Sequence, residues 1–182
     1  MKIYTAPEEY VKFKCDIEVF LAGGIQKCHE WQQKVIEVLK KLSSNKINYY
    51  RFVVLNPKRD SFDVNASNEE VSKQIKWEFD HLEQCDIFSM YFCNSDSVQP
   101  ICMYELGRNI LKMQEKYPDS WQHRLIISVE DGYSREVDVI EQVKLATNGE
   151  VEVNLHSNPE SHANQIFKAY DFISGKMFYK FI

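Results

Sequence analysis

The sequence predicts an α/β fold in which helices cover both faces of an open, doubly wound parallel sheet of about five strands. Short apolar runs alternate with amphipathic stretches along most of the chain, and this strand-helix order is typical of parallel sheets. The chain has 182 residues, of which 44% are hydrophobic, enough for a core of its own. We therefore expect a single domain over residues 1–182.

Three strands are expected in the first half of the chain. Residues 17–22 form an apolar run that ends at Gly23 and Gly24, and residues 52–55 and 87–92 form two more runs. Helices are expected between them, because apolar residues recur there at helical spacing. The apolar positions are Trp31, Val35, Val38, Leu39 and Leu42 in the first helix, and Val71, Ile75, Phe79 and Leu82 in the second.

The second half continues the alternation after a polar turn at residues 94–99. Pro100 suits an early helix position, residues 125–129 read as a fourth strand, and residues 151–155 as a short fifth. The helical faces comprise Met103, Leu106, Ile110 and Met113, then Val137, Ile140, Val143 and Leu145, and finally Ile166, Phe167, Tyr170 and Ile173. Right-handed crossovers turn this order into a Rossmann-like or flavodoxin-like sheet, with its ligand crevice at the carboxyl ends of the strands.

The composition restricts the partners. The net charge is -5, and the 22 basic residues are scattered, so we expect no polymeric nucleic acid but a small neutral or mildly anionic ligand. Five cysteines without a C-x-x-C pair indicate reduced thiols. The first ten residues lack an apolar leader, and no run approaches the roughly 18 apolar residues of a membrane span. We expect a cytoplasmic protein without membrane contact.

Two glutamates are the main candidates for chemistry. Glu78 falls on the apolar stripe of the second helix, where a carboxylate is rare, although it equally fits the edge of that stripe as an ion-pair partner. Glu105 lies early in the helix after the third strand. Taken alone, it is more simply interpreted as an ordinary acidic residue that the positive end of the helix dipole favours. Counting helical and strand rise places both carboxylates at about the same level.

A pair of this kind suits retaining glycoside chemistry, which needs two carboxyl groups about 5 to 5.5 Å apart. We expect the helix N-terminus to keep Glu105 ionised as the nucleophile, and burial to leave a proton on Glu78. The histidines lack metal-ligand spacing, so we expect no metal. Gly23 and Gly24 lack the G-x-G-x-x-G spacing of a dinucleotide site and, taken alone, form a tight turn.

Several segments together resemble the nucleoside 2-deoxyribosyltransferase-like proteins, which are related to 2'-deoxynucleoside 5'-phosphate N-hydrolases. The resemblance runs from about Val19 to Arg108. It rests on residues 20–25, Trp31, residues 54–59, 74–78 and 85–87, and the Tyr-Glu-Leu-Gly segment at residues 104–107.

The resemblance implies a Rossmann-like sheet, no cofactor, a homo-oligomer, and a double displacement in which Glu105 attacks C1' of the deoxyribose and Glu78 contacts the sugar or assists departure of the base. The expected substrate-binding residues are Phe20, Gly23, Gly24, Asn56, Arg59, Gln99 and Tyr104. Phe20 departs from the pattern, since several members carry a tyrosine there that orients the nucleophile. Gln99 is the nearest equivalent of an acidic sugar-binding residue in the transferases.

The leading hypothesis is cleavage of the N-glycosidic bond of a 2'-deoxynucleoside, with transfer of the deoxyribosyl group to another free base through a covalent glutamyl intermediate. Hydrolysis of a 2'-deoxynucleoside 5'-monophosphate, with water as the acceptor, is the first alternative, and the departures at Phe20 and Gln99 favour it. A noncatalytic nucleotide-binding module is the second, because a fold alone does not guarantee chemistry.

Overall fold

A computed structural model describes residues 1–44, 50–59 and 67–179 of the chain. Over these residues, six parallel strands form one sheet in the order β1-β3-β2-β4-β5-β6. The strands are β1 (Lys2–Thr5), β2 (Asp16–Gly23), β3 (Arg51–Asn56), β4 (Ile87–Phe92), β5 (Leu125–Glu130) and β6 (Asn154–Ser157). The predicted α/β class with a doubly wound parallel sheet is confirmed.

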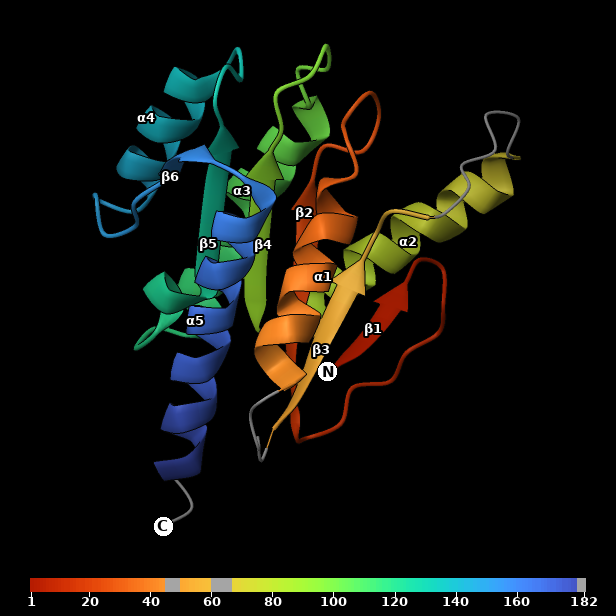
Figure 1. Cartoon of the computed structure of the whole chain (residues 1–182), viewed down its shortest axis with the longest axis vertical. Coiled ribbons are helices and arrows are strands. Elements are labelled where there is room, and N and C mark those ends of the chain that lie inside the picture. The colour runs from red at the N-terminus through yellow and green to blue at the C-terminus, as the bar shows by residue number, and fades with distance from the viewer. Residues whose placement is uncertain (45–49, 60–66, 180–182) are drawn as a thin grey trace.

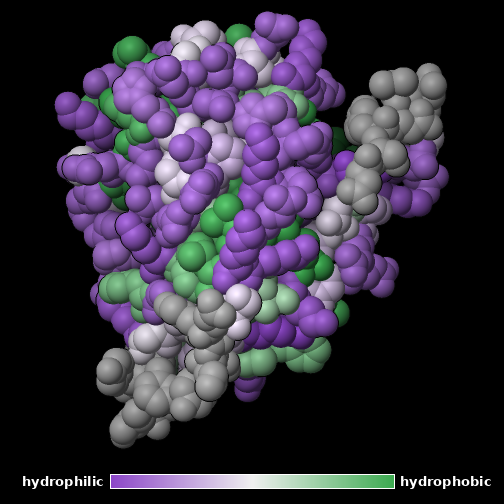
Figure 2. Space-filling view, in the orientation of Figure 1, coloured by the Kyte–Doolittle hydropathy of each residue, from purple (hydrophilic) through white to green (hydrophobic). Residues whose placement is uncertain are grey.

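Helices cover both faces of this sheet (Figure 1). One face carries α1 (Trp31–Ser44) and α5 (Pro159–Tyr179), and the other carries α2 (Asn68–Gln84), α3 (Pro100–Lys116) and α4 (Glu136–Ala146). A short 3₁₀ helix, η1 (Trp121–Arg124), precedes β5. The outer surface over α1 and α5 is mainly hydrophilic, with hydrophobic side chains gathered near its centre (Figure 2).

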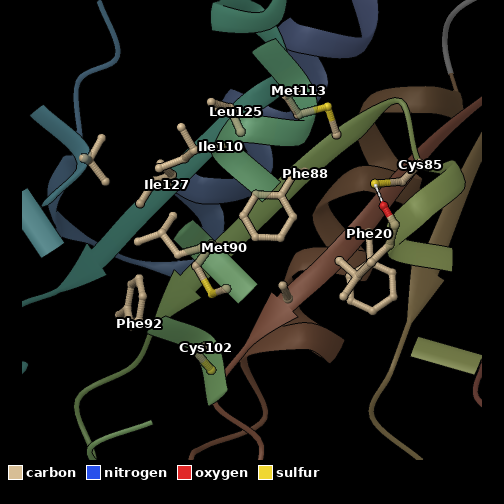
Figure 3. Close-up of a cluster of buried hydrophobic side chains, with 14 of the residues drawn as sticks. Phe20, Cys85, Phe88, Met90, Phe92, Cys102, Ile110, Met113, Leu125 and Ile127 are labelled. Atoms are coloured by element: carbon tan, nitrogen blue, oxygen red, sulfur yellow. Dashed lines mark hydrogen bonds between the residues drawn. The ribbon is translucent and has the colours of Figure 1, made fainter. Parts of the chain in front are cut away.

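The core consists of two apolar layers, one on each face of the sheet. In the layer beneath α2, α3 and α4, Phe20 of β2 and Phe88 of β4 lie side by side in register, with Ile110 of α3 packed in the same cluster (Figure 3). Nearly all side chains of β2 and β4 are buried, as expected for central strands that helices cover on both sides.

The connections diverge between β2 and β4, which are neighbours in the sheet. The chain leaves β2 through α1 toward β3 on one side, and leaves β4 through α3 toward β5 on the other. This divergence is the topological switch point at which open α/β sheets hold ligands. The loops after Gly23 and Phe92 therefore form the walls of the expected crevice.

The sheet differs from the prediction at its two edges. Strand β1 was not anticipated, and β6 begins at Asn154 rather than at residue 151. Both strands have four residues, and both pair with one neighbour only. An edge strand of this length buries too little surface to require a distinctive apolar pattern.

The predicted apolar face of α2 is wrong at three of its four positions, and Leu82 is the one that is buried. Val71, Ile75 and Phe79 are exposed at 39%, 59% and 50%, whereas Trp77 and Leu82 pack against the sheet. The helix begins with a capping box at Ser67, and its buried residues are Trp77, His81 and Leu82. In α4, similarly, Val137 and Leu145 are exposed, and Val139 and Val143 are buried. Among the described helices, none has both the length and the apolar character to cross a membrane.

Candidate active site

The loop after β2 brings its backbone close to neighbouring segments. At Gly23, which has φ +149°, a Cβ atom would lie 2.3 Å from the carbonyl oxygen of Tyr91. At Gly24 it would lie 2.5 Å from the Sγ atom of Cys28 and 2.6 Å from the Oε1 atom of Gln99. Gly23 therefore requires glycine, whereas a side chain at Gly24 would have to displace those of Cys28 and Gln99. Both glycines line a cavity.

Gln99 ends the loop after β4 and lies immediately before α3. Its backbone is left-handed, with φ 49°, and its side chain is 4% exposed. The Nε2 group donates a hydrogen bond of 2.7 Å to the carbonyl oxygen of Cys93, which fixes the amide. The buried Oε1 atom accepts no hydrogen bond from any described residue. A buried acceptor without a donor is costly, so this oxygen is available to a ligand hydroxyl or amine.

Glu78 from α2 and Glu105 from α3 line one cavity of about 360 Å³ at the switch point. Phe20, Gly23, Gly24 and Gln99 line the same cavity. The structure thus brings together both proposed catalytic glutamates and four of the expected substrate-binding residues. The volume falls in the lower part of the range of small-molecule sites.

Burial is the main cause that raises the pKa of Glu105 to about 7, and the nearby carboxylate of Glu78 adds to the rise. The expectation that the helix N-terminus keeps this carboxyl group ionised is therefore wrong. Glu105 is the sixth residue of α3, beyond the first turn, where the dipole effect has faded. Desolvation outweighs the remaining attraction, as well as the opposing effect of Arg108.

The pKa of Glu78 is also raised by burial, but its surroundings oppose the rise. The Oε1 atom of Glu78 accepts a hydrogen bond of 2.6 Å from the Nε2 atom of Gln74, and the charge of Arg59 also favours the ionised form. The Nε atom of Arg59 in turn donates to Gln74. This chain of three side chains ties Glu78 to the loop after β3. In contrast, no described side chain donates a hydrogen bond to the carboxyl group of Glu105.

A second cavity of about 330 Å³ adjoins the first through shared lining by Glu78 and Pro57. Lys58 and Arg59 line only this second cavity. The Nζ atom of Lys58 pairs with Glu30 at 2.5 Å. Glu78 therefore stands between a lobe with a second carboxyl group and a lobe with two cations.

Two expected binding residues lie apart from these cavities. The side chain of Asn56 closes the turn after β3, because its Oδ1 atom accepts a 3.1 Å hydrogen bond from the backbone N–H of Lys58. Tyr104 is 67% exposed on the outer side of α3. Neither residue lines either cavity. Conversely, Gln26, Ser97 and Cys102 line the first cavity although no sequence pattern marked them.

The prediction that all five cysteines are reduced thiols is wrong for two of them. Cys28 and Cys93 form a disulfide, whereas Cys15, Cys85 and Cys102 are free. The disulfide joins the loop after β2 to the end of β4. Cys28 lies next to Gly24, and Cys93 accepts the hydrogen bond from Gln99. A separation of 65 residues and the absence of a C-x-x-C spacing hid this pairing in the sequence.

A family model described as nucleoside 2-deoxyribosyltransferase like matches residues 16–117. The matched region begins at β2 and ends just after α3, so it includes both glutamates and the loops that line the first cavity. No curated protein sequence matches the chain.

Proposed function

Because the chain belongs to the nucleoside 2-deoxyribosyltransferase like family, which indicates an enzyme that acts on nucleosides, we propose that it cleaves the N-glycosidic bond of a 2'-deoxynucleoside. The observation that carries the proposal is the pair Glu78 and Glu105 in one cavity at the switch point of the sheet. Two carboxyl groups with unequal surroundings are the arrangement used by enzymes that need a nucleophile and a proton carrier in one site.

In the proposed first step, the carboxylate of Glu105 attacks C1' of the deoxyribose. A C–O ester bond forms, the C1'–N bond breaks, and its electron pair leaves with the base. The departing nitrogen takes up a proton, which lowers the barrier to departure. The second step reverses this sequence, with an acceptor at C1' and Glu105 as the leaving group.

Glu78 is the proposed proton carrier and sugar contact. With the pKa of Glu105 at about 7, the pair retains one proton below neutral pH. When a sugar enters, this proton passes from Glu105 to Glu78, which leaves Glu105 nucleophilic and Glu78 able to donate to the base. Gln74 holds the carboxyl group of Glu78 in place through its 2.6 Å hydrogen bond.

The remaining lining residues are proposed to position the substrate. The backbone at Gly23 and Gly24 lies beside the sugar and base, and the free Oε1 atom of Gln99 accepts a hydrogen bond from a sugar hydroxyl. Phe20 offers an apolar surface but no hydroxyl to orient Glu105. The pKa of Glu105 is set by burial and by Glu78, which raise it, and by Arg108, which lowers it.

A 2'-deoxynucleoside 5'-monophosphate is the second candidate substrate, favoured by one observation. The lobe lined by Lys58 and Arg59 adjoins the glutamate cavity at Glu78, so a phosphate group could reach the two cations while the sugar stays at the carboxyl pair. Arg59→Gln would then weaken binding of a deoxynucleotide more than binding of the matching deoxynucleoside.

The experiment that tests the function incubates the protein with each deoxynucleoside and each deoxynucleoside monophosphate, with and without free adenine, and separates the products by chromatography. A new nucleoside in the presence of adenine supports deoxyribosyl transfer. Release of the base alone identifies water as the acceptor. Binding without turnover of any substrate contradicts an enzyme and supports a noncatalytic module.

A homo-oligomer is proposed on the basis of the surface beside the cavity. Val71, Ile75 and Phe79 form an exposed apolar stripe on α2, and Ile101 and Tyr104 of α3 are exposed at 66% and 67%. Such a surface suits contact with a second copy of the chain, which would shield the open cavity from water. Light scattering should give a mass above that of one chain, and Phe79→Glu should lower it. A monomeric wild-type protein contradicts the proposal.

A further inference from the structure

A further cavity lies at the other end of α3 from the two glutamates. It has a volume of about 510 Å³ and is formed where the end of α3 and the following turn meet the last turns of α5. It shares no lining residue with the glutamate cavity. Helix α3 carries Glu105 in its second turn and Lys116 at its end, so about 16 Å of helix separates these two lining residues.

Positive charge dominates the lining of this cavity. Lys116, Arg124 and Lys176 contribute three cations, and Asp119 and Asp86 contribute two carboxylates. The Oδ2 atom of Asp86 also lies 2.7 Å from the Nζ atom of Lys12, which is outside the lining and is shared with Glu18 at 3.3 Å. The three cations outnumber the two carboxylates of the lining, so a net positive charge faces the cavity and would attract an anion such as a phosphate monoester.

The cations are held in fixed positions. Arg124 stacks over the ring of Tyr117 at 3.6 Å and donates a 3.1 Å hydrogen bond to the carbonyl oxygen of Asp86. The Nζ atom of Lys116 donates to the carbonyl oxygen of Gln84 at 3.0 Å. Neither Arg124 nor Lys176 forms an ion pair with another described residue.

Partial desolvation acts on two of these cations, Lys116 and Arg124. Desolvation lowers the pKa of Lys116 and that of Arg124, and the nearby negative charge of Asp86 offsets this only in part. An anion bound between the cations would supply the missing stabilisation, because electrostatic attraction is stronger where water is partly excluded.

The opposite wall of the cavity is apolar. Phe172, Ile173 and Met177 project from α5, and Pro118 lies across from them. The Nζ atom of Lys176 lies over the ring of Phe172, 4.5 Å from the ring centroid. A cation beside an aromatic surface fits a ligand that combines a phosphate with a planar or apolar body.

We propose that this cavity is a second, noncatalytic ligand site that binds a phosphate monoester with an aromatic group, the chemistry of a nucleoside monophosphate. The phosphate lies between Arg124 and Lys176, and the aromatic group packs against Phe172 and Met177. The site requires no turnover and is independent of the reaction proposed for the glutamate cavity.

The test is calorimetric titration of the full chain with adenosine 5'-monophosphate and, separately, with inorganic phosphate. Lys176→Glu should weaken binding of the nucleotide at least tenfold, because it reverses one of the two contacting charges. Lys168→Glu is the matched control, since Lys168 is an exposed residue of the same helix that does not line the cavity. It should change the affinity less than twofold.

Two further variants separate the parts of the proposal. Phe172→Ala should weaken binding of the nucleotide and leave binding of inorganic phosphate unchanged. Glu105→Ala should leave nucleotide binding at this site intact. The proposal is overturned if no saturable binding occurs, if Lys176→Glu binds as tightly as the wild type, or if Glu105→Ala removes the binding.

Discussion

Glu105 and Glu78 reach one cavity from two different helices, and burial, followed by the charge of Glu78, raises the pKa of Glu105 to about 7. The side chain that the proposed mechanism uses as a nucleophile is thus the more strongly protonated member of the pair. A protonated carboxyl group is a poor nucleophile, but the two carboxyl groups titrate as a pair. The proton can therefore move to Glu78 and leave Glu105 ionised.

The first prediction concerns pH. The productive form carries one proton on the pair, so kcat/KM for base release should be highest below pH 7 and should fall as the pH rises through about 7, where Glu105 loses that proton. Steady-state rates between pH 5 and 9 measure this directly. A rate that keeps rising above pH 7 would show that Glu105 needs only to be ionised.

Glu78→Gln should change both the rate of the reaction and the pKa of Glu105. It removes the proton carrier, which should reduce kcat by about a hundredfold or more. It also removes the neighbouring negative charge, so the pKa of Glu105, followed by NMR of a labelled carboxyl carbon, should move downward. Glu69→Gln is the matched control, because Glu69 is exposed on the same helix and pairs with Lys73. It should change neither quantity.

A second prediction concerns stability. The folded protein holds the proton of Glu105 more tightly than the unfolded chain does, so the associated stabilisation is complete below the unfolded pKa and is lost as the pH rises through about 7. Glu105→Gln removes this loss. Relative to the wild type, the variant should gain up to about 3 kcal/mol in the free energy of unfolding at pH 8, and less than about 1 kcal/mol at pH 5. Urea unfolding at both pH values checks this, and an equal gain at both would contradict it.

A third prediction compares two glycines. Gly23→Ala places a Cβ atom 2.3 Å from a backbone oxygen at φ +149°, and should lower the free energy of unfolding by about 1 to 3 kcal/mol while raising KM. Gly107→Ala lies in α3, where a Cβ atom meets nothing within 4 Å, and should stabilise the protein by about 0.5 to 1 kcal/mol. Thermal or urea unfolding of both variants distinguishes a steric requirement from a general effect of alanine.

The sequence is sufficient for the central part of the fold, because central parallel strands carry continuous apolar runs. Residues 17–22 and 87–92 have this pattern, and both lie within buried strands. Edge strands lack it, which is why β1 was missed. The buried face of α2 was predicted wrongly for a different reason. Val71, Ile75 and Phe79 have the spacing of a buried face, but they are exposed in the single chain.

The glutamate pair could be anticipated because strand order places the ends of neighbouring elements together. Glu78 was placed correctly beside the crevice, even though the stripe used to place it is exposed. The protonation of Glu105 could not be anticipated, because desolvation depends on the side chains that surround it in three dimensions. The Cys28–Cys93 disulfide likewise depends on a contact between two loops that are 65 residues apart.

Mass spectrometry of the protein quenched during turnover of a deoxynucleoside tests whether Glu105 is the nucleophile. We expect a deoxyribosyl adduct on the peptide that contains Glu105 in the wild type and in the control Glu115→Ala. In Glu105→Ala, both the adduct and base release should be absent. Full turnover by Glu105→Ala, or an adduct on another residue, would show that Glu105 is not the nucleophile.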